Sequence, residues 1–305
     1  MTTLVVATLV AVAALAALIF LAARRSGKTL WNWLELLIVP LALAAVGFAF
    51  TAAQSARDNR RDDRRAEIDR TLADRRAAAD RALAQDRQRE ETLQTYLQQM
   101  SDLLLERHLA STRLGAQQRV LASTLTLTVL RRLDGERKGV VLRFISDAQL
   151  INSEDPKLTL DGADFRGAIM DGAALDHPHL VRVDLRGASF RSALLLFGDF
   201  KSADLRGADF SNTIQDYSSF TATCLSGATF AQATLTKPSF FGLFGHDIDF
   251  RGANIIDPSW RAVHFWRLRG SAPGVPVESG DRRGHFSRSA EERYCAYQRS
   301  AGSVG

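Results

Sequence analysis

The sequence has few of the residues that build cross-linked or metal-bound small folds. Of its 305 residues only two are cysteines, Cys224 and Cys295, and no CxxC motif occurs. This argues against a disulfide scaffold, a zinc ribbon and a redox motif, and it suits a reducing compartment. The two histidines of His177-Pro178-His179 have no third ligand nearby in the sequence, so we expect no metal site. Walker A, HExxH, G-x-S-x-G and G-x-G-x-x-G motifs are also absent, so we expect no enzymatic activity and no cofactor.

Long hydrophobic runs are confined to the first fifty or so residues. Residues 4–23 carry no charge, and a second apolar stretch covers 30–53 after a connector with three basic residues. About twenty residues at 1.5 Å each span a hydrocarbon core of roughly 30 Å, so residues 1–53 predict a two-helix transmembrane hairpin. Six Arg residues follow the second run, which predicts that both termini face the cytoplasm. Glu35, beside two tryptophans, is expected at the lipid headgroups.

The next segment, 54–110, has no continuous apolar face. Between 54 and 91 it holds eleven Arg and ten acidic residues, with opposite charges recurring three positions apart. Such pairs support an exposed helix, so we predict a charged stalk roughly 80 Å long. Leu93, Leu97, Met100 and Leu104 follow a 4-3-4 spacing, which fits either a short coiled coil between two copies or packing against this chain's next helices. The interleaved acidic residues argue against nucleic-acid binding.

A period of five residues is the strongest pattern in the chain. Every fifth residue from Leu160 to Phe265 is large and apolar, except Gln215 and Gly245. Two positions earlier the residue is usually alanine. Because i and i−2 of an extended segment point to the same side, a large and a small residue share each interior layer. The period matches neither a helix nor a hairpin and requires a turn every five residues.

This pattern resembles the pentapeptide-repeat family, whose units read A-(D/N)-L-x-x. Residues 163–167 (ADFRG) and 203–207 (ADLRG) carry the match. The resemblance implies a right-handed quadrilateral parallel β-helix over residues 156–266, with four units per coil and coils about 4.8 Å apart. Leu243 and Ile248, where alanine is usual, predict a distorted or widened last coil or two. The membrane hairpin and helices also resemble some membrane-tethered bacterial members of the family, which have no assigned activity, and this implies a multi-pass protein of the bacterial inner membrane.

Two further segments flank the repeats. Residues 111–155 predict a helical hairpin that turns at Asp134-Gly135. We expect it to cap the open end of the β-helix, whose strand edges would otherwise invite aggregation. The tail, 267–305, is rich in Gly, Ser, Pro and Arg, and is predicted to be flexible with a short helix near 289–298.

Positions twenty apart should stack on one face of such a β-helix. One face then bears opposite-sign ladders: Asp164, Asp184 and Asp204 beside Arg166, Arg186 and Arg206. We interpret these as solvated residues that offset each other's repulsion.

Another face carries outward apolar residues, here named the partner patch: Leu194, Leu196, Phe197, Ile214 and Tyr217. Contiguous exposed apolar surface usually marks a partner. The alternative is that the C-terminal tail, or a bulge at Gln215, covers it.

These features predict a membrane-anchored, non-enzymatic scaffold that presents a rigid β-helix for protein–protein interaction at the cytoplasmic face of the membrane. The expected partners are the lipid bilayer and an unidentified protein, with a homodimer through the stalk as a further option. One alternative is a DNA-mimicking modulator of an enzyme such as gyrase, which some family members bind in place of DNA. Residues 160–265 contain twelve Asp, no Glu and nine Lys or Arg, which is weakly acidic for such a mimic. The other alternative is a membrane sensor coupled through the stalk, for which the sequence offers no ligand site.

Overall fold

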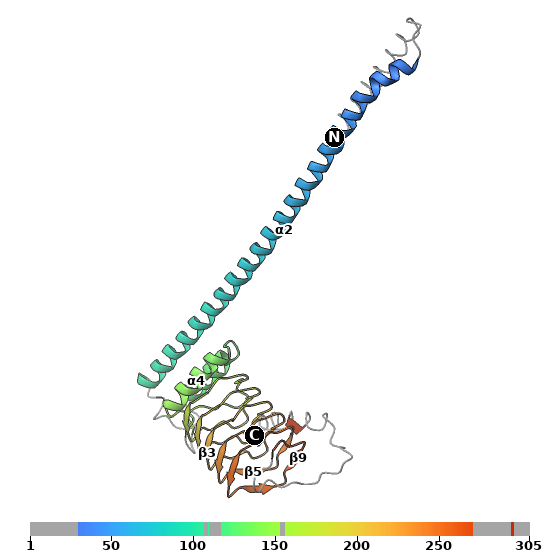
Figure 1. Ribbon diagram of the computed structural model, residues 1–305. Coiled ribbons are helices and arrows are strands. Elements are labelled where there is room, and N and C mark those ends of the chain that lie inside the picture. Colours follow the sequence, from blue (N-terminus) through green and yellow to red (C-terminus); the bar gives the residue numbers. More distant parts are fainter. Residues whose placement is uncertain (1–29, 107–108, 110–116, 153–155, 271–293, 296–305) are drawn as a thin grey trace. The chain divides into compact units, whose positions relative to one another are not determined.

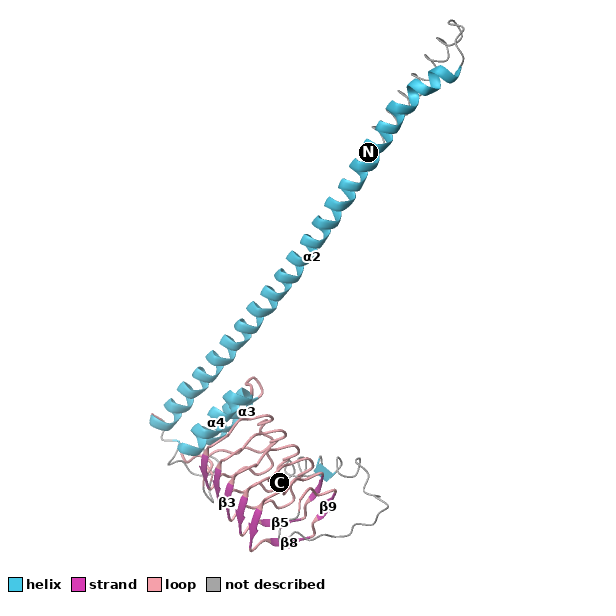
Figure 2. Ribbon diagram, viewed as in Figure 1, coloured by secondary structure: helices cyan, strands magenta, loops and turns pink. Residues whose placement is uncertain are grey.

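The computed structural model describes residues 30–106, 109, 117–152, 156–270 and 294–295 (Figure 1). Helices α2 (Leu30–Leu105), α3 (Gln117–Leu130) and α4 (Gly135–Asp147) precede all the strands. The strands are β1 (Ala174–Asp176), β2 (Leu194–Leu196), β3 (Ile214–Asp216), β4 (Thr234–Thr236), β5 (Ser239–Phe241), β6 (Phe244–His246), β7 (Asn254–Ile256), β8 (Ser259–Arg261) and β9 (His264–Trp266) (Figure 2). A boundary between two compact units falls after Ala82, inside α2.

In the first unit, α2 is a helix with a solvent-exposed surface. Every described side chain between 42 and 82 is exposed, including Ile68 at 58% and Leu72 at 42%. The Ala and Arg residues that dominate this stretch have high helix propensity, and no Gly or Pro interrupts it after Gly47. Among the described residues, no helix combines the length and hydropathy that a bilayer span requires. The first predicted span, 4–23, lies outside the described residues.

From Leu83 onwards, α2 packs with α3 and α4 into a helical layer. Leu93 and Met100 are 5% and 0% exposed, and Leu97 and Leu104 pack against the same core. The sequence left open whether this seam forms a coiled coil between two copies or packs against this chain's next helices, and the structure shows the packing within the chain. The Tyr96 hydroxyl lies 3.0 Å from Thr126 Oγ1, and burial raises the pKa of Tyr96.

Arg137 links α4 to α2 electrostatically. Its guanidinium lies 2.9 Å from Asp86, 3.0 Å from Glu90 and 2.6 Å from Asp134. Asp134 is also the N-cap of α4, where its side chain accepts a hydrogen bond from the Arg137 N–H. Partial burial acts to raise the pKa of Asp134, but these bonds from Arg137 lower it. The turn predicted at Asp134-Gly135 is thus a capped helix start.

The repeats form a β-solenoid whose strands are all parallel. Strand β1 pairs with β2, β2 with β3, β3 with β4 and β4 with β7, and each step joins residues twenty apart, as in Leu175↔Leu195. Strands β5–β8 and β6–β9 make two shorter sheets with the same offset. Twenty residues per coil are four units of five, so the period read from the sequence is confirmed. The offset continues through β9, so the register does not slip in the coils where distortion was expected.

The solenoid core contains two stacked aromatic columns beside buried leucine and alanine side chains. In the first, Phe190, Phe210, Phe230 and Phe250 stack at centroid distances of 5.0 to 5.2 Å. In the second, Phe200, Phe220, Phe240 and Trp260 stack at 4.3 to 5.3 Å. Rings of the two columns meet edge to face, for example Phe200 and Phe210 at 5.8 Å. Both geometries are favourable for aromatic pairs and add to the effect of burial.

The two exceptions to the period are accommodated inside the core. Gln215 is 1% exposed, and its amide nitrogen donates to Thr213 Oγ1 at 3.0 Å. At Gly245, a Cβ would lie 2.7 Å from Ile248 Cδ1. Ile248 therefore occupies the space that a large central residue would fill, which explains why alanine is replaced there.

The helical layer satisfies backbone groups of the first coil. The hydrogen bonds are Ile169 N–H to Gly135 O (2.9 Å), His179 N–H to Ile151 O (2.9 Å), Thr159 N–H to Ser123 Oγ (3.0 Å), Lys138 Nζ to Arg166 O (3.3 Å) and Arg143 Nη2 to Asp171 O (3.0 Å). These groups have no preceding coil to pair with. The layer thus supplies partners that a strand edge otherwise lacks.

Helix α4 approaches the first coil closely because two glycines face it. A Cβ at Gly135 would lie 2.0 Å from Gly167 O, and a Cβ at Gly139 would lie 2.0 Å from Ile169 O. The two glycines are four residues apart, so they lie on one face of the helix. Only glycine permits this backbone-to-backbone contact.

Candidate protein-binding face

The partner patch lies on the sheet β1-β2-β3-β4-β7 and on the corner that follows each strand. The corner residues are His177, Phe197, Tyr217, Lys237 and Asp257, and their φ angles lie between +49° and +53°. Bulky residues seldom adopt this left-handed conformation, and such strain often marks a functional site. Here, however, the conformation recurs at successive corners of the solenoid. It is therefore a property of the repeat and gives no evidence for a site.

The side chains at these corners form a stacked column. Phe197 and Tyr217 stack at 5.4 Å, and His177 stacks on Phe197 at 4.4 Å. Lys237 Nζ lies 5.0 Å from the Tyr217 ring centroid and donates to the Tyr217 hydroxyl at 2.7 Å. Each contact joins adjacent coils, so the column is held rigid along the solenoid. Phe197 and Tyr217 remain 42% and 47% exposed.

Aliphatic residues extend the patch from the corner onto the strands. Leu194 on β2 pairs in register with Ile214 on β3, and they are 36% and 57% exposed. Leu196, the last residue of β2, is half-buried. All five predicted residues therefore lie on two adjacent coils, and four of them are exposed.

The patch has a polar rim. Asp176 and His177 lie on the preceding coil, where the histidine Nδ1 and the carboxylate are 2.8 Å apart. Lys237 lies on the following coil, and its hydrogen bond with the Tyr217 hydroxyl raises its pKa. An apolar centre with charged groups at its edge is the usual anatomy of a protein-binding surface.

The bulge considered at Gln215 is absent from the described strands. Leu195 pairs with Gln215 and Gln215 with Leu235, without an inserted residue. The tail segments that were the other proposed cover, 271–293 and 296–305, lie outside the described residues.

The predicted opposite-sign ladders lie on another face, but the expectation that these residues are solvated is wrong for the carboxylates, since Asp204 is 1% exposed. Arg186 Nε and Nη2 donate to the two carboxylate oxygens of Asp184 at 2.8 and 2.7 Å. Arg186 Nε also lies 3.6 Å from Asp204 on the next coil. Hydrogen bonds from Arg166, and then from Lys138, hold the pKa of Asp164 well below its usual range. These carboxylates are neutralised by fixed cations, so the ladders present no free acidic field.

No candidate metal cluster emerges in the described part of the chain. No group of three or more His, Cys, Asp or Glu residues there could hold a metal ion. His177 contacts Asp176, and His179 Nδ1 lies 3.5 Å from Asp199. The Glu35 side chain lies outside the described residues. The absence of a cofactor and of enzymatic activity stays a prediction.

The pairing of Cys224 with Cys295 was not predicted from the sequence. The two residues form a disulfide with Cα atoms 6.0 Å apart and a sequence separation of 71. The two cysteines are thus bonded despite their wide spacing, because distant residues of the chain can meet on the surface of a solenoid. The even number of cysteines was the available signal.

Comparison with known proteins agrees with this architecture. The protein-family model for pentapeptide repeats matches residues 159–195 and 179–214. These residues are pentapeptide repeats. The pentapeptide-repeat solenoid then continues through β9 by its twenty-residue register. No curated protein matches the chain.

Solved pentapeptide-repeat proteins give further similarities. One from the cyanobacterium Cyanothece is 15% identical with a TM-score of 0.21, and the match covers 36% of this chain and 65% of that protein's chain. One from the Arabidopsis thaliana thylakoid lumen is 24% identical with a TM-score of 0.19, and the match covers 33% of this chain and 56% of that one. HetL of Nostoc, described as involved in heterocyst differentiation regulation, is 19% identical with a TM-score of 0.16. The match covers 37% of this chain and 65% of HetL. This chain spans less than two thirds of each of them, and identities and TM-scores this low transfer no function.

Proposed function

We propose that this protein is a membrane-anchored, non-enzymatic scaffold whose pentapeptide-repeat solenoid binds another protein through the partner patch. The observation that carries the proposal is the exposed column of Phe197 and Tyr217 beside Leu194 and Ile214. The part of an apolar side chain that stays exposed in the folded protein adds no hydrophobic stabilisation to the fold, whereas it does contribute when a partner covers it.

The solenoid gives this patch a rigid support. Neighbouring coils are joined by backbone hydrogen bonds, such as Leu194 N–H to Ala173 O at 2.8 Å and Ile214 N–H to Ala193 O at 3.0 Å. The stacked rings have little freedom to reorient. A preorganised surface loses little conformational entropy when it binds, which favours affinity for a given contact area.

The membrane anchor is proposed from the sequence. Two apolar runs, 4–23 and 30–53, have the length of bilayer spans, and a short basic connector separates them. Basic residues flank the second run on both sides, with three before it and six after it. The basic-residue rule therefore favours a cytoplasmic solenoid by a small margin.

A DNA-mimicking function is not favoured. Mimicry of a duplex requires an extended field of unpaired negative charge. In this solenoid the carboxylates of Asp184 and Asp204 are bound by Arg186 and Arg206. The ladder that comes closest to an acidic face is thus electrically balanced.

The test is in-cell photocrosslinking from the patch. A photoreactive phenylalanine analogue replaces Tyr217 in the full chain, alone or together with Phe197→Asp and Ile214→Asp. The proposal expects a discrete crosslinked partner that disappears in the charged variant. Phe241→Asp is the matched control, because Phe241 is 49% exposed but lies on β5, outside the patch.

Two results would contradict the proposal. One is the absence of a discrete crosslink from Tyr217 when a photoreactive residue at position 241 gives the same background. The other is a crosslink that Phe241→Asp and the charged patch variant weaken equally, because this would trace the loss to a general effect on folding.

A further inference from the structure

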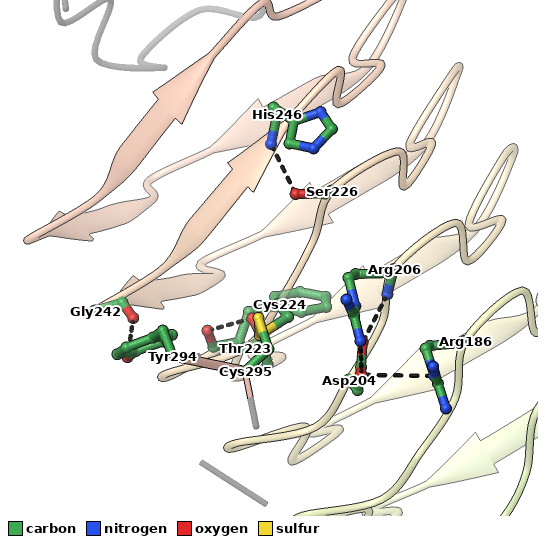
Figure 3. The surroundings of a disulfide bond; sticks show 11 residues. Arg186, Asp204, Arg206, Thr223, Cys224, Ser226, Gly242, His246, Tyr294 and Cys295 are labelled. Carbon is green, nitrogen blue, oxygen red and sulfur yellow. Dashed lines mark hydrogen bonds and ion pairs between the residues drawn. A yellow bond between two sulfur atoms is a disulfide. The ribbon is translucent and has the colours of Figure 1, made fainter. Parts of the chain in front are cut away.

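The second cysteine is joined to an outward position of the solenoid. Cys224 follows Asp204 and precedes Phe244 in a column of parallel bridges on one face. Outward positions of the repeat usually meet solvent, yet Cys224 is 2% exposed and its partner Cys295 is 1% exposed. Figure 3 shows Tyr294 and Cys295 lying against this face beside Cys224.

The residue before Cys295 makes its own contacts with the solenoid. The Tyr294 hydroxyl donates to Gly242 O at 2.8 Å (Figure 3). The centroids of the Tyr294 and Phe244 rings are 4.2 Å apart. Cys224 belongs to one repeat unit, and Gly242 and Phe244 lie one coil further along. Tyr294 and Cys295 therefore bridge two coils, through a covalent bond to the first and non-covalent contacts to the second. The non-covalent contacts hold Tyr294 on the solenoid next to the bonded cysteine.

We propose that Cys224–Cys295 is a permanent structural disulfide and that the solenoid therefore matures in an oxidising compartment, on the side of the membrane away from the cytoplasm. Disulfides of this kind persist where thiols are oxidised and are rare in the cytosol. Exchange requires a thiolate to reach one of the sulfur atoms. Burial of both cysteines blocks that approach, so the bond suits permanent reinforcement and not a reversible switch.

Formation of the bond needs a defined electron acceptor. Each of the two thiols loses one proton and one electron, and a sulfur–sulfur bond forms between them. The acceptor is the disulfide of a thiol–disulfide oxidoreductase, which leaves as a dithiol after a mixed-disulfide intermediate. Such exchange proteins operate in the compartments where disulfides persist.

This location is opposite to the cytoplasmic one that the basic residues favour. Only the side of the membrane, and not the disulfide itself, rests on the proposed anchor. Two spans return the chain to the side where it began, so a solenoid outside the cytoplasm leaves the 24–29 connector inside it. That connector contains Arg24, Arg25 and Lys28. Three basic residues in a six-residue loop are compatible with a cytoplasmic position. The six Arg residues after the second run belong to a segment much longer than the loops of about 60 residues or fewer for which the rule holds, and such long segments cross membranes largely regardless of charge.

The first test traps the thiols in living cells. Cells producing the full chain are quenched in acid, and denatured protein reacts with a polyethylene-glycol maleimide before or after chemical reduction. The proposal expects no adduct before reduction and two after it, whereas two adducts before reduction would overturn it. Cys224→Ser is the control, since its single thiol should give one adduct in both conditions.

The second test locates the solenoid. In a Cys224→Ser, Cys295→Ser background, Ser192→Cys places one thiol at an exposed corner of the solenoid. Labelling by a membrane-impermeant maleimide in intact spheroplasts supports the proposal, and labelling only after lysis overturns it. Neither test involves the partner patch, so their failure is distinguishable from failure of the proposed binding function.

Discussion

Replacing Gly139 by alanine is a sharp test of how the helical layer contacts the solenoid, because two effects predict opposite signs. Gly139 lies inside α4, where alanine is favoured over glycine by about 1 kcal/mol. If α4 were only loosely placed on the first coil, Gly139→Ala would therefore stabilise the protein. The contact geometry predicts the reverse.

The magnitude follows from the distance between the helix and the coil. The new Cβ would lie 2.0 Å from Ile169 O, well inside the 3.4 Å at which ordinary contact begins. Relieving this overlap requires α4 to move away, and such overpacking costs about 1–3 kcal/mol. The movement also stretches the 2.9 Å bond from the Ile169 N–H to Gly135 O, worth roughly 0.5–1.5 kcal/mol. After subtracting the helix-propensity gain, we expect a net destabilisation of about 1–3 kcal/mol.

The assay is urea unfolding of the full chain, followed by far-ultraviolet circular dichroism. The midpoint of Gly139→Ala should fall while the slope stays unchanged, because the same surface unfolds. Val140→Ala is the matched control, since the neighbouring Val140 is 43% exposed and its truncation should change stability by less than about 0.5 kcal/mol. A Gly139→Ala protein more stable than the parent by about 1 kcal/mol, the gain expected from propensity alone, would refute the close contact.

Three further results are expected. Phe210→Ala removes a fully buried ring that stacks with two others and should cost about 3–5 kcal/mol in urea unfolding, whereas Phe210→Leu should cost clearly less. The Arg166 guanidinium lowers the pKa of Asp164 in the folded protein. The ion pair therefore stabilises the fold fully above about pH 4, the pKa of Asp in the unfolded chain, and this stabilisation is lost as the pH falls towards the folded pKa. Asp164→Asn should therefore flatten the fall in urea midpoint below about pH 4, and an unchanged pH profile would contradict the pairing. Cys295→Ser removes the disulfide that closes a loop with a sequence separation of 71, and it should lower the free energy of unfolding by about 2–4 kcal/mol. The reduced parent protein and Cys224→Ser should lose the same amount, and a smaller loss in Cys224→Ser would contradict a bond between the two cysteines.

The solenoid was predictable because its sequence signal is local and repeated. A large residue at every fifth position fixes which side chains point inward, and stacking at twenty-residue intervals follows from four such units per coil. The same register predicted the ladder of Asp184 and Arg186 and the exposure of Phe197 and Tyr217. The right-handed winding stays a prediction from the family resemblance.

Other features depend on contacts that have no local signal. Nothing near Cys224 or Cys295 in the sequence marks them as partners, because the contact joins residues that are 71 positions apart. The roles of Gly135 and Gly139 were equally hidden, since a glycine in a helix pattern usually indicates a turn or a weak position. The seam at Leu93 and its neighbours was visible, but its periodicity is the same whether the partner is another copy or the chain itself.

The partner patch can be separated from the requirements of the fold by comparing its aromatic and aliphatic parts. The stacks that Phe197 makes with His177 and Tyr217 contribute about 0.5–1.5 kcal/mol each, which is enough to offset a left-handed backbone conformation that costs about 1–2 kcal/mol. Stability of the solenoid can therefore explain the rings without any partner.

No such explanation covers Ile214, which is 57% exposed on a strand where threonine would serve the backbone equally well. Ile214→Thr should change the unfolding free energy by less than about 0.5 kcal/mol, because the substituted side chain is exposed and both residues are β-branched. The same substitution should weaken the crosslink from position 217, because it removes apolar contact area from the patch. If the crosslink yield stayed at the parent level while Phe197→Asp abolished it, binding would depend on the corner alone. The strands would then have to be removed from the proposed site.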